Sequence, residues 1–259
     1  MQNQQPSTLK EIRVHGTQDF PCAFYQTGTR IRGNMVKHHW HEEVELLYFS
    51  GGEFCLEINM ERFEISEECF YFINPGELHS ISVEKNGGCV ENAVVFHMDM
   101  LSSAYALDQI QTNLIQPVQN GSIQFPRCLR KNEPAFEPVR KSYEEIRNVF
   151  GGDSFRENYY DGEAVTDDIT RQLFIKSALL RILAVLSANN LFEVTEKNHD
   201  RRIETIKTTL TYIQENYKEK IYIRDLADLI GMNEQYFCRF FKKVIGRSPM
   251  EYVNEYRIK

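Results

Sequence analysis

The sequence lacks the features of a membrane or secreted protein. No apolar run is long enough to span a bilayer, and the opening stretch MQNQQPSTLKEIR is polar, without the hydrophobic core of a signal peptide. The six cysteines, at positions 22, 55, 69, 89, 128 and 238, include no CxxC pair. A disulfide framework or a zinc ribbon is therefore not indicated, and we expect a cytoplasmic protein with reduced thiols and no membrane partner.

Motifs for several kinds of chemistry are missing as well. There is no phosphate-binding glycine loop and no paired nucleophile and base. The sequence has fewer basic than acidic residues, with 30 Lys+Arg and 37 Asp+Glu, which gives a net charge of −7. The deficit is uneven, because residues 201–259 hold 12 basic and 8 acidic residues (net +4), whereas residues 1–200 hold 18 and 29 (net −11). This asymmetry predicts that only the C-terminal part contacts DNA.

The basic C-terminal part contains a helix-turn-helix pattern. In residues 223–246, IRDLADLIGMNEQYFCRFFKKVIG, apolar residues recur at helical spacing on both sides of Gly231. Asn233 is expected to N-cap the second helix and Gly246 to end it. If Phe237 and Phe241 face inward, the opposite face carries polar groups that can reach base edges and phosphates, namely Gln235, Cys238, Arg239 and Lys242, with Lys243 beside them. The alternative is a helical hairpin with a solvated charged face.

The run that follows strengthens the DNA-binding interpretation. Ser248-Pro249-Met250-Glu251 has the pattern of a capping box that opens another helix. With it, residues 203–259 resemble the first half of the DNA-binding domain of the AraC/XylS family of bacterial transcription regulators. Members of that family continue into a second helix-turn-helix, so the resemblance implies that a chain ending at Lys259 is a truncated fragment. It also implies a homodimer, an operator in double-stranded DNA, contact with RNA polymerase, and a cupin-like domain that senses a small molecule, carbohydrates being the first class to consider.

Residues 1–100 have the pattern of a small β-barrel or sandwich. Runs rich in aromatic and β-branched residues at 46–49, 53–58, 69–73 and 90–97 are separated by turns rich in glycine and asparagine.

One of these runs holds a set of candidate ligands. In HHWHEEVELLYFSGG, strand alternation points His39, His41 and Glu45 to one face, and the turn NPGELH adds His79. These positions resemble the two motifs of the cupin fold, although Cys69 and Val83 replace a glycine and an asparagine of the second motif. Such a set suits a divalent transition metal, Zn, Ni, Mn or Fe. Two other interpretations are an organic effector bound directly, and inherited barrel residues that hydrogen-bond one another. No cofactor is required by the pattern, and His38 is expected on the other face.

A long apolar helix is predicted at 166–188, after a shorter one at 137–150. It is apolar over more than one face, so it is expected to be buried on two sides. It is either an ordinary core helix or, as the family resemblance implies, part of a dimer interface with Leu179 and Leu183 facing outward.

The predicted fold class is α+β. The expected layout is an effector-binding cupin-like barrel with its connector at 1–135, a helical dimerisation segment at 136–190, a linker at 191–200, and the first half of the all-α DNA-binding domain at 201–259. The predicted function is a sequence-specific transcription regulator, not an enzyme, controlled by a small-molecule effector. The alternative is a metal-dependent cupin enzyme such as a dioxygenase or sugar isomerase.

Overall fold

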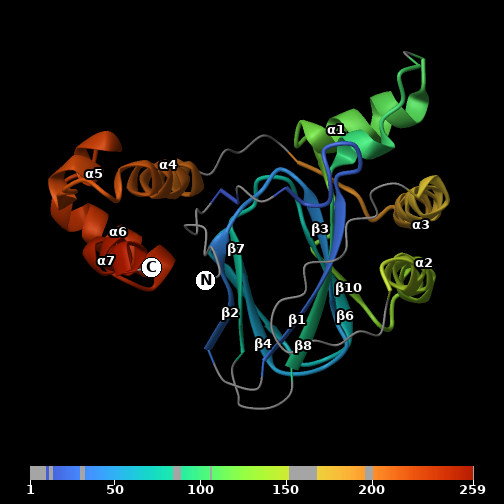
Figure 1. Ribbon diagram of the computed structural model, residues 1–259, viewed down its shortest axis with the longest axis horizontal. Coiled ribbons are helices and arrows are strands. Elements are labelled where there is room, and N and C mark those ends of the chain that lie inside the picture. Colours follow the sequence, from blue (N-terminus) through green and yellow to red (C-terminus); the bar gives the residue numbers. More distant parts are fainter. Residues whose placement is uncertain are drawn as a thin grey trace.

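The fold is α+β, as predicted, with an N-terminal β-sandwich of the cupin type and a C-terminal helical region (Figure 1). The computed structural model describes residues 10–11, 14–29, 33–83, 89–105, 107–151, 168–195 and 201–258.

Two antiparallel sheets form the sandwich. The five-stranded sheet has the order β1-β8-β3-β6-β10, with β1 at Cys22–Thr29, β8 at Cys89–Phe96, β3 at Val44–Phe49, β6 at Cys69–Ile73 and β10 at Cys128–Arg130. The four-stranded sheet has the order β2-β7-β4-β5, with β2 at Gly33–His39, β7 at His79–Val83, β4 at Phe54–Ile58 and β5 at Glu61–Ile65.

The five-stranded sheet is buried on both faces. Its inner face packs on the four-stranded sheet, where Leu47 and Tyr71 share a core with Leu56 and Ile81. Its outer face packs on two helices, α2 (Phe136–Val149) and α3 (Ile169–Ala188), through side chains such as Tyr48, Phe70, Tyr143 and Leu179. Because neither face meets water, every residue of β3 and β6 is buried, and Glu45 is the one charged side chain in the two strands.

The predicted orientation of α3 is wrong in one respect. Leu179 and Leu183 face inward and are only 1% and 3% exposed, because that side of the helix packs on α2 and on the sheet. The apolar side chains that face outward are Ile169, Leu173, Phe174 and Leu180.

The segment between the sandwich and α2 is more regular than its sequence indicated. It contains two short helical turns, η1 (Met98–Leu101) and η2 (Gln111–Ile115), then α1 (Gln116–Gln119), β9 (Ile123–Gln124) and β10. β10 adds an edge strand to the larger sheet. β11 (Glu193–Val194) pairs with β9, so part of the predicted linker is attached to the sensor domain.

The C-terminal region has the predicted helix-turn-helix. Its helices are α4 (Arg201–Asn216), α5 (Ile223–Leu229), α6 (Glu234–Ile245) and α7 (Pro249–Ile258). The predicted caps are confirmed: the Asn233 side chain accepts a hydrogen bond from the Tyr236 amide, and Gly246 ends α6 at φ +77°. Ser248 and Glu251 form the expected reciprocal pair before α7.

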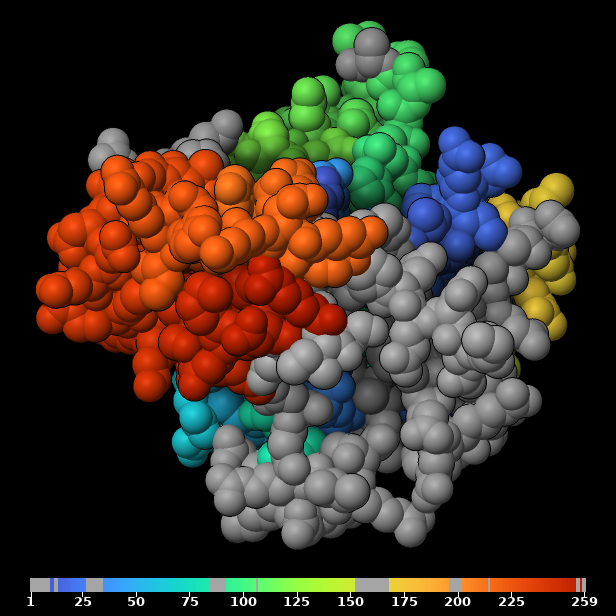
Figure 2. Space-filling model, turned by 60° about the vertical axis from the view of Figure 1, so that its left-hand side comes forward, coloured from blue at the N-terminus to red at the C-terminus, as the bar shows by residue number. Residues whose placement is uncertain are grey.

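The helical region lies against the sandwich on the side away from α2 and α3 (Figure 1). Its surface is the orange and red part of Figure 2, which adjoins the sandwich directly. Two sandwich residues join the core of this region: Leu78 is buried together with Ile206 and Leu210 of α4, and Trp40 packs at its edge. The two parts therefore share an apolar contact.

Candidate functional site

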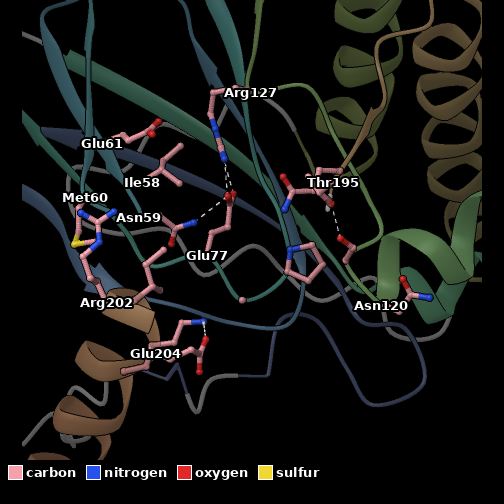
Figure 3. Close-up of a pocket in the computed structure, with 16 residues that line it drawn as sticks. Ile58, Asn59, Met60, Glu61, Glu77, Asn120, Arg127, Thr195, Arg202 and Glu204 are labelled. Atoms are coloured by element: carbon pink, nitrogen blue, oxygen red, sulfur yellow. Dashed lines mark hydrogen bonds and ion pairs between the residues drawn. The ribbon is translucent and has the colours of Figure 1, made fainter. Parts of the chain in front are cut away.

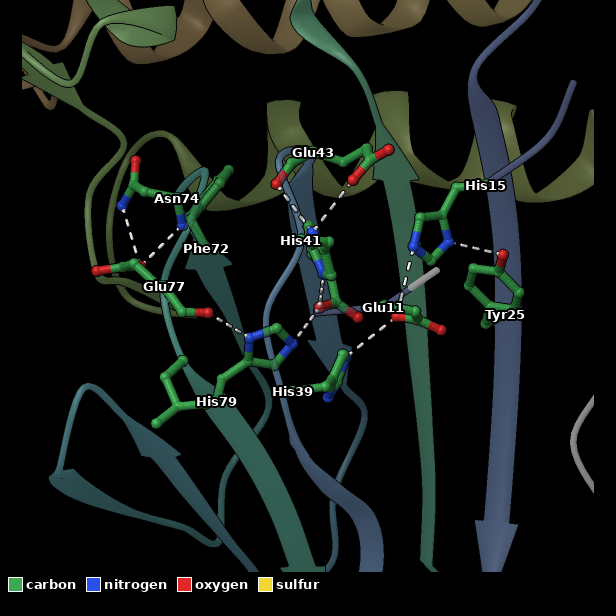
Figure 4. A network of polar contacts seen from close by, with 12 residues as sticks. Glu11, His15, Tyr25, His39, His41, Glu43, Phe72, Asn74, Glu77 and His79 are labelled. Carbon is green, nitrogen blue, oxygen red and sulfur yellow. Dashed lines mark hydrogen bonds and ion pairs between the residues drawn. The ribbon is translucent and has the colours of Figure 1, made fainter. Parts of the chain in front are cut away.

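The structure brings the four predicted ligand residues together (Figure 4). His39 ends β2 opposite His79, which begins β7, while Glu45 lies on β3. One ligand atom from each of His39, His41, Glu45 and His79 lies within 4.8 Å of the others. The Glu45 carboxylate is the centre of the group, since its Oε2 lies 2.9 Å from Nε2 of His79 and 3.3 Å from Nε2 of His41. We call these four residues the ligand cluster.

The three imidazoles of the ligand cluster are oriented in the same manner. Each Nδ1 lies close to a backbone carbonyl, at 2.8 Å for His39, 3.1 Å for His41 and 2.9 Å for His79. A carbonyl can only accept, so Nδ1 donates and, in the neutral ring, Nε2 keeps a lone pair directed into the cluster. Metal-bound histidines are commonly oriented by this kind of hydrogen bond from the other ring nitrogen.

The charge states suit a cation. Burial raises the pKa of the Glu45 carboxyl, but its close contacts with the His41 and His79 rings outweigh burial and hold that pKa well below its usual value. Burial and the neighbouring His79 keep the pKa of His39 well below its usual value. At neutral pH the cluster therefore offers an anionic oxygen and a neutral imidazole, which fits the donor preferences of Zn, Ni, Mn and Fe.

Two further residues at the cluster were missed from the sequence. Oε2 of Glu11 lies 3.4 Å from Nε2 of His15 and 3.5 Å from Nε2 of His39. Burial raises the pKa of Glu11, yet the neighbouring imidazoles of His15, His39 and His41 outweigh burial and lower it to about 2. Both residues lie in a stretch without strand or helix periodicity, so no pattern placed them near the sandwich. His38, by contrast, is on the other face as expected, with its Nε2 3.0 Å from Glu57.

The back of the ligand cluster touches the DNA-binding region. Trp40 lies between His39 and His41 in the chain, and Nζ of Lys207 on α4 is 4.7 Å from the centroid of its ring. Leu78 precedes His79 and is buried against α4. The cluster residues and the residues that contact α4 are thus immediate neighbours in two short stretches of chain.

A polar hollow of about 700 Å³ opens at the same junction (Figure 3). It lies between the β4–β5 turn, the loop at 75–77 and the first turns of α4. Glu77 pairs with Arg127 at 2.5 Å and also accepts hydrogen bonds from Asn74 and Asn59. Acidic and basic groups are mixed along its walls, so its charge does not select one class of ligand.

The outer face of α6 carries the predicted DNA-contacting residues. Phe237, Phe241 and Ile245 are buried. The predicted residues lie elsewhere on the helix, with Gln235, Arg239, Lys242 and Lys243 exposed and Cys238 half-buried. Tyr236, which the sequence did not single out, is also exposed at 52% and adds an aromatic ring beside them.

Comparison with known proteins agrees with both parts of the structure. Residues 24–147 match the AraC-like ligand binding domain, and residues 213–254 match the bacterial regulatory helix-turn-helix proteins of the AraC family. A Bacillus subtilis (strain 168) HTH-type transcriptional regulator, YdeC, is 27% identical over 96% of this chain and 80% of its own length. The melibiose operon regulatory protein of Escherichia coli (strain K12) is 23% identical over 86% of this chain and 69% of its own.

Among solved structures, an apo form of a ToxT variant from Vibrio cholerae aligns with 92% of this chain and 98% of its own at 10% identity and a TM-score of 0.40. Within the described residues, no helix is long and apolar enough to cross a membrane. The two family matches describe the domains of a regulator, so the alternative of a metal-dependent cupin enzyme is wrong. The chain belongs to the AraC family and is a DNA-binding transcription regulator with an N-terminal ligand-binding domain and a C-terminal helix-turn-helix.

Proposed function

We propose that the ligand cluster is the sensing site of this regulator and that it works as a divalent metal centre. The observation that carries the proposal is the orientation of the three imidazoles. Each has Nδ1 beside a backbone carbonyl, Nε2 of His41 and of His79 contacts Glu45, and all three rings offer a ligand atom to the cluster. Residues that merely hydrogen-bonded one another would not need all three Nε2 atoms on one side. His39, His41, Glu45 and His79 would hold the ion.

The effector that we infer is a small molecule with oxygen donors. An octahedral ion held by three imidazoles and a carboxylate keeps room for further ligands, and hydroxyl or carboxylate oxygens suit those positions. Carbohydrates are the first class to test, because one relative is named for the melibiose operon.

Metal content tests this proposal. Protein purified without chelator should contain at least one transition-metal ion per chain when measured by plasma mass spectrometry, and His79→Asn should lower that content by about one ion per chain. His38→Asn is the matched control, because His38 is a histidine of the same sheet that lies outside the cluster. A wild-type metal content far below one ion per chain would exclude the metal centre and leave an organic effector bound directly to the cluster.

For the output of the regulator, we infer that α6 enters the major groove. Gln235, Cys238 and Arg239 would face base edges, while Lys242 and Lys243 would lie near phosphates. Support comes from the exposure of four of these five side chains and from the buried opposite face of the helix. A DNA-bound regulator in the bacterial cytoplasm would have RNA polymerase as its further partner.

The partner that we infer for α3 is a second copy of this chain. Its outward side presents Ile169, Leu173 and Leu180 at helical spacing, with the small residues Ser177 and Ala184 on the same side. An apolar stripe with small residues at its middle lets an identical helix approach closely, as a twofold interface requires. The helix α3 lies on the side of the sandwich away from α4–α7, so pairing through α3 would leave α6 accessible (Figure 1).

A further inference from the structure

We propose that Glu11, His15 and His41 form a second ion-binding set beside the ligand cluster, so that the sensor domain binds two divalent transition-metal ions. The inference rests on the proposed function, because the first ion is the one held by the cluster. Glu11, His15 and His41 each offer a ligand atom, and these atoms lie within 4.8 Å of one another. Two of the three residues come from the segment before β1, outside the cupin motifs.

His15 is oriented like the histidines of the cluster. Its side chain is only 3% exposed, and its Nδ1 lies 2.8 Å from the hydroxyl of Tyr25 on β1. The other nitrogen, Nε2, is buried without a hydrogen bond of good geometry and faces Oε2 of Glu11 at 3.4 Å. Buried polar atoms in folded proteins are nearly always satisfied, so an exception calls for a partner such as an ion.

Contacts of the backbone fix both Glu11 and His15. The Glu11 amide donates a hydrogen bond to the Trp40 carbonyl at 2.9 Å. Directly after His15, Gly16 has φ +82°, and a Cβ there would lie 2.4 Å from the Cys22 carbonyl oxygen, so only glycine fits against the start of β1. The position of the His15 ring at the cluster is therefore built into the fold.

The six donors divide naturally into two equal sets. One ion would take His39, Glu45 and His79, and the other would take Glu11, His15 and His41. Each set has two imidazoles and one carboxylate, a combination that binds divalent transition metals and leaves open positions. Around a tetrahedral ion with bonds of about 2.1 Å, neighbouring ligand atoms lie about 3.4 Å apart. The Glu11–His15 separation of 3.4 Å matches this spacing, whereas the Glu45–His79 separation of 2.9 Å would have to widen by about 0.5 Å around an ion.

His41 is what couples the two sets. Its ring centroid lies 5.1 Å from that of His79 and 5.2 Å from that of His15. With a single ion bound, His41 would complete the four-residue cluster; with two, it would turn to the second ion. The two carboxylates would offset the repulsion between the ions. The ordinary alternative is that Glu11 only pairs with His15 and His39.

Ion stoichiometry decides between these alternatives. Chelator-treated protein is reloaded with excess Zn(II), desalted and analysed by native mass spectrometry, with circular dichroism to confirm folding of each variant. The wild type should carry two zinc ions, whereas Glu11→Gln and His15→Asn should each carry one. His79→Asn should also carry one, since it leaves the second set intact. The control His38→Asn should still carry two.

This experiment distinguishes failure of the second ion-binding set from failure of the metal centre at the ligand cluster. One ion in the wild type, unchanged in Glu11→Gln and His15→Asn, would overturn the second set and leave the first. Two ions retained in both of these variants would overturn it equally. Absence of bound zinc from the wild type would overturn the proposed metal centre itself.

Discussion

Nζ of Lys207 lies 4.7 Å from the centroid of the Trp40 ring, in a contact that joins α4 to the stretch between two cluster histidines. A cation over an aromatic face stabilises by about 0.5–2 kcal/mol. Because neighbouring residues of an extended chain point to opposite sides, His39 and His41 face the cluster while Trp40 faces α4. A shift of either histidine on ligand binding would therefore move the ring on which Lys207 rests.

Trp40→Leu should uncouple sensing from DNA binding. The variant keeps an apolar side chain but loses the ring, so zinc binding should persist while the effect of zinc on DNA affinity falls toward none. The measurement is DNA affinity by fluorescence anisotropy, with and without zinc. Tyr222→Leu is the control, because it removes a similar ring beneath Lys220, 4.9 Å away, within the DNA-binding region alone. If zinc changes the DNA affinity of Trp40→Leu as much as that of the wild type, the coupling between the cluster and the DNA-binding region does not depend on Trp40.

Leu173→Glu and Leu180→Glu should each prevent dimerisation. A carboxylate placed in an apolar interface must be desolvated without a partner, at a cost of several kcal/mol. Light scattering at tens of micromolar should find a wild-type dimer and monomeric variants with unchanged circular dichroism. Arg171→Glu, which also places a glutamate at an exposed position of α3 but outside the apolar stripe, should remain dimeric. A monomeric wild type would refute the interface.

Arg239→Ala should lower the preference for selected DNA over random DNA. An arginine that bonds guanine through two hydrogen bonds is worth about 1–3 kcal/mol of discrimination. Lys243→Ala should instead weaken binding to both kinds of DNA about equally and flatten the salt dependence, as the loss of a phosphate contact does. The affinities can be compared on DNA selected by the protein from a random pool. Equal losses on both DNAs for Arg239→Ala would show that α6 does not read sequence.

The sequence was most informative where local chemistry decides the structure. Asn233 and Gly246 act on backbone groups within their own helix, so the adjacent sequence was sufficient to predict their roles as caps. The convergence of His39, His41 and Glu45 also follows from one short stretch, and only His79 required a motif from elsewhere. Such features depend on spacing and not on how distant segments pack.

The missed features depend on tertiary contacts. Glu11 and His15 lie at the cluster because of backbone contacts made at Trp40 and Gly16. The sequence has no periodicity that predicts these contacts. Leu179 and Leu183 were placed outward because a helix that is apolar over more than one face gives no sign of which apolar side meets solvent. In the structure, both leucines are buried in the core that α3 shares with α2.

Glu11→Gln should change how the stability of the metal-free protein depends on pH. The pKa of Glu11 is lowered from 4.5 to about 2 in the folded chain, so its carboxylate contributes stability that is complete above about pH 4.5. This contribution, up to about 3 kcal/mol, is lost as the pH falls toward 2. Urea unfolding between pH 3 and 6 should therefore show the wild type losing its advantage over Glu11→Gln as the pH falls. Glu64→Gln, at an exposed side chain, should follow the wild type. A difference that stays constant with pH would contradict the assignment.

The dissociation constant for selected DNA, measured on zinc-loaded and chelator-stripped protein, tests most directly whether the ligand cluster controls α6. Coupling between two sites in one protein is typically worth about 1–3 kcal/mol, so the two states should differ in affinity by about 5- to 150-fold. In His79→Asn, which lacks a cluster ligand, the difference should shrink toward none. Equal affinity of the zinc-loaded and stripped wild type, with zinc shown to be bound, would contradict a role for this cluster in regulating DNA binding.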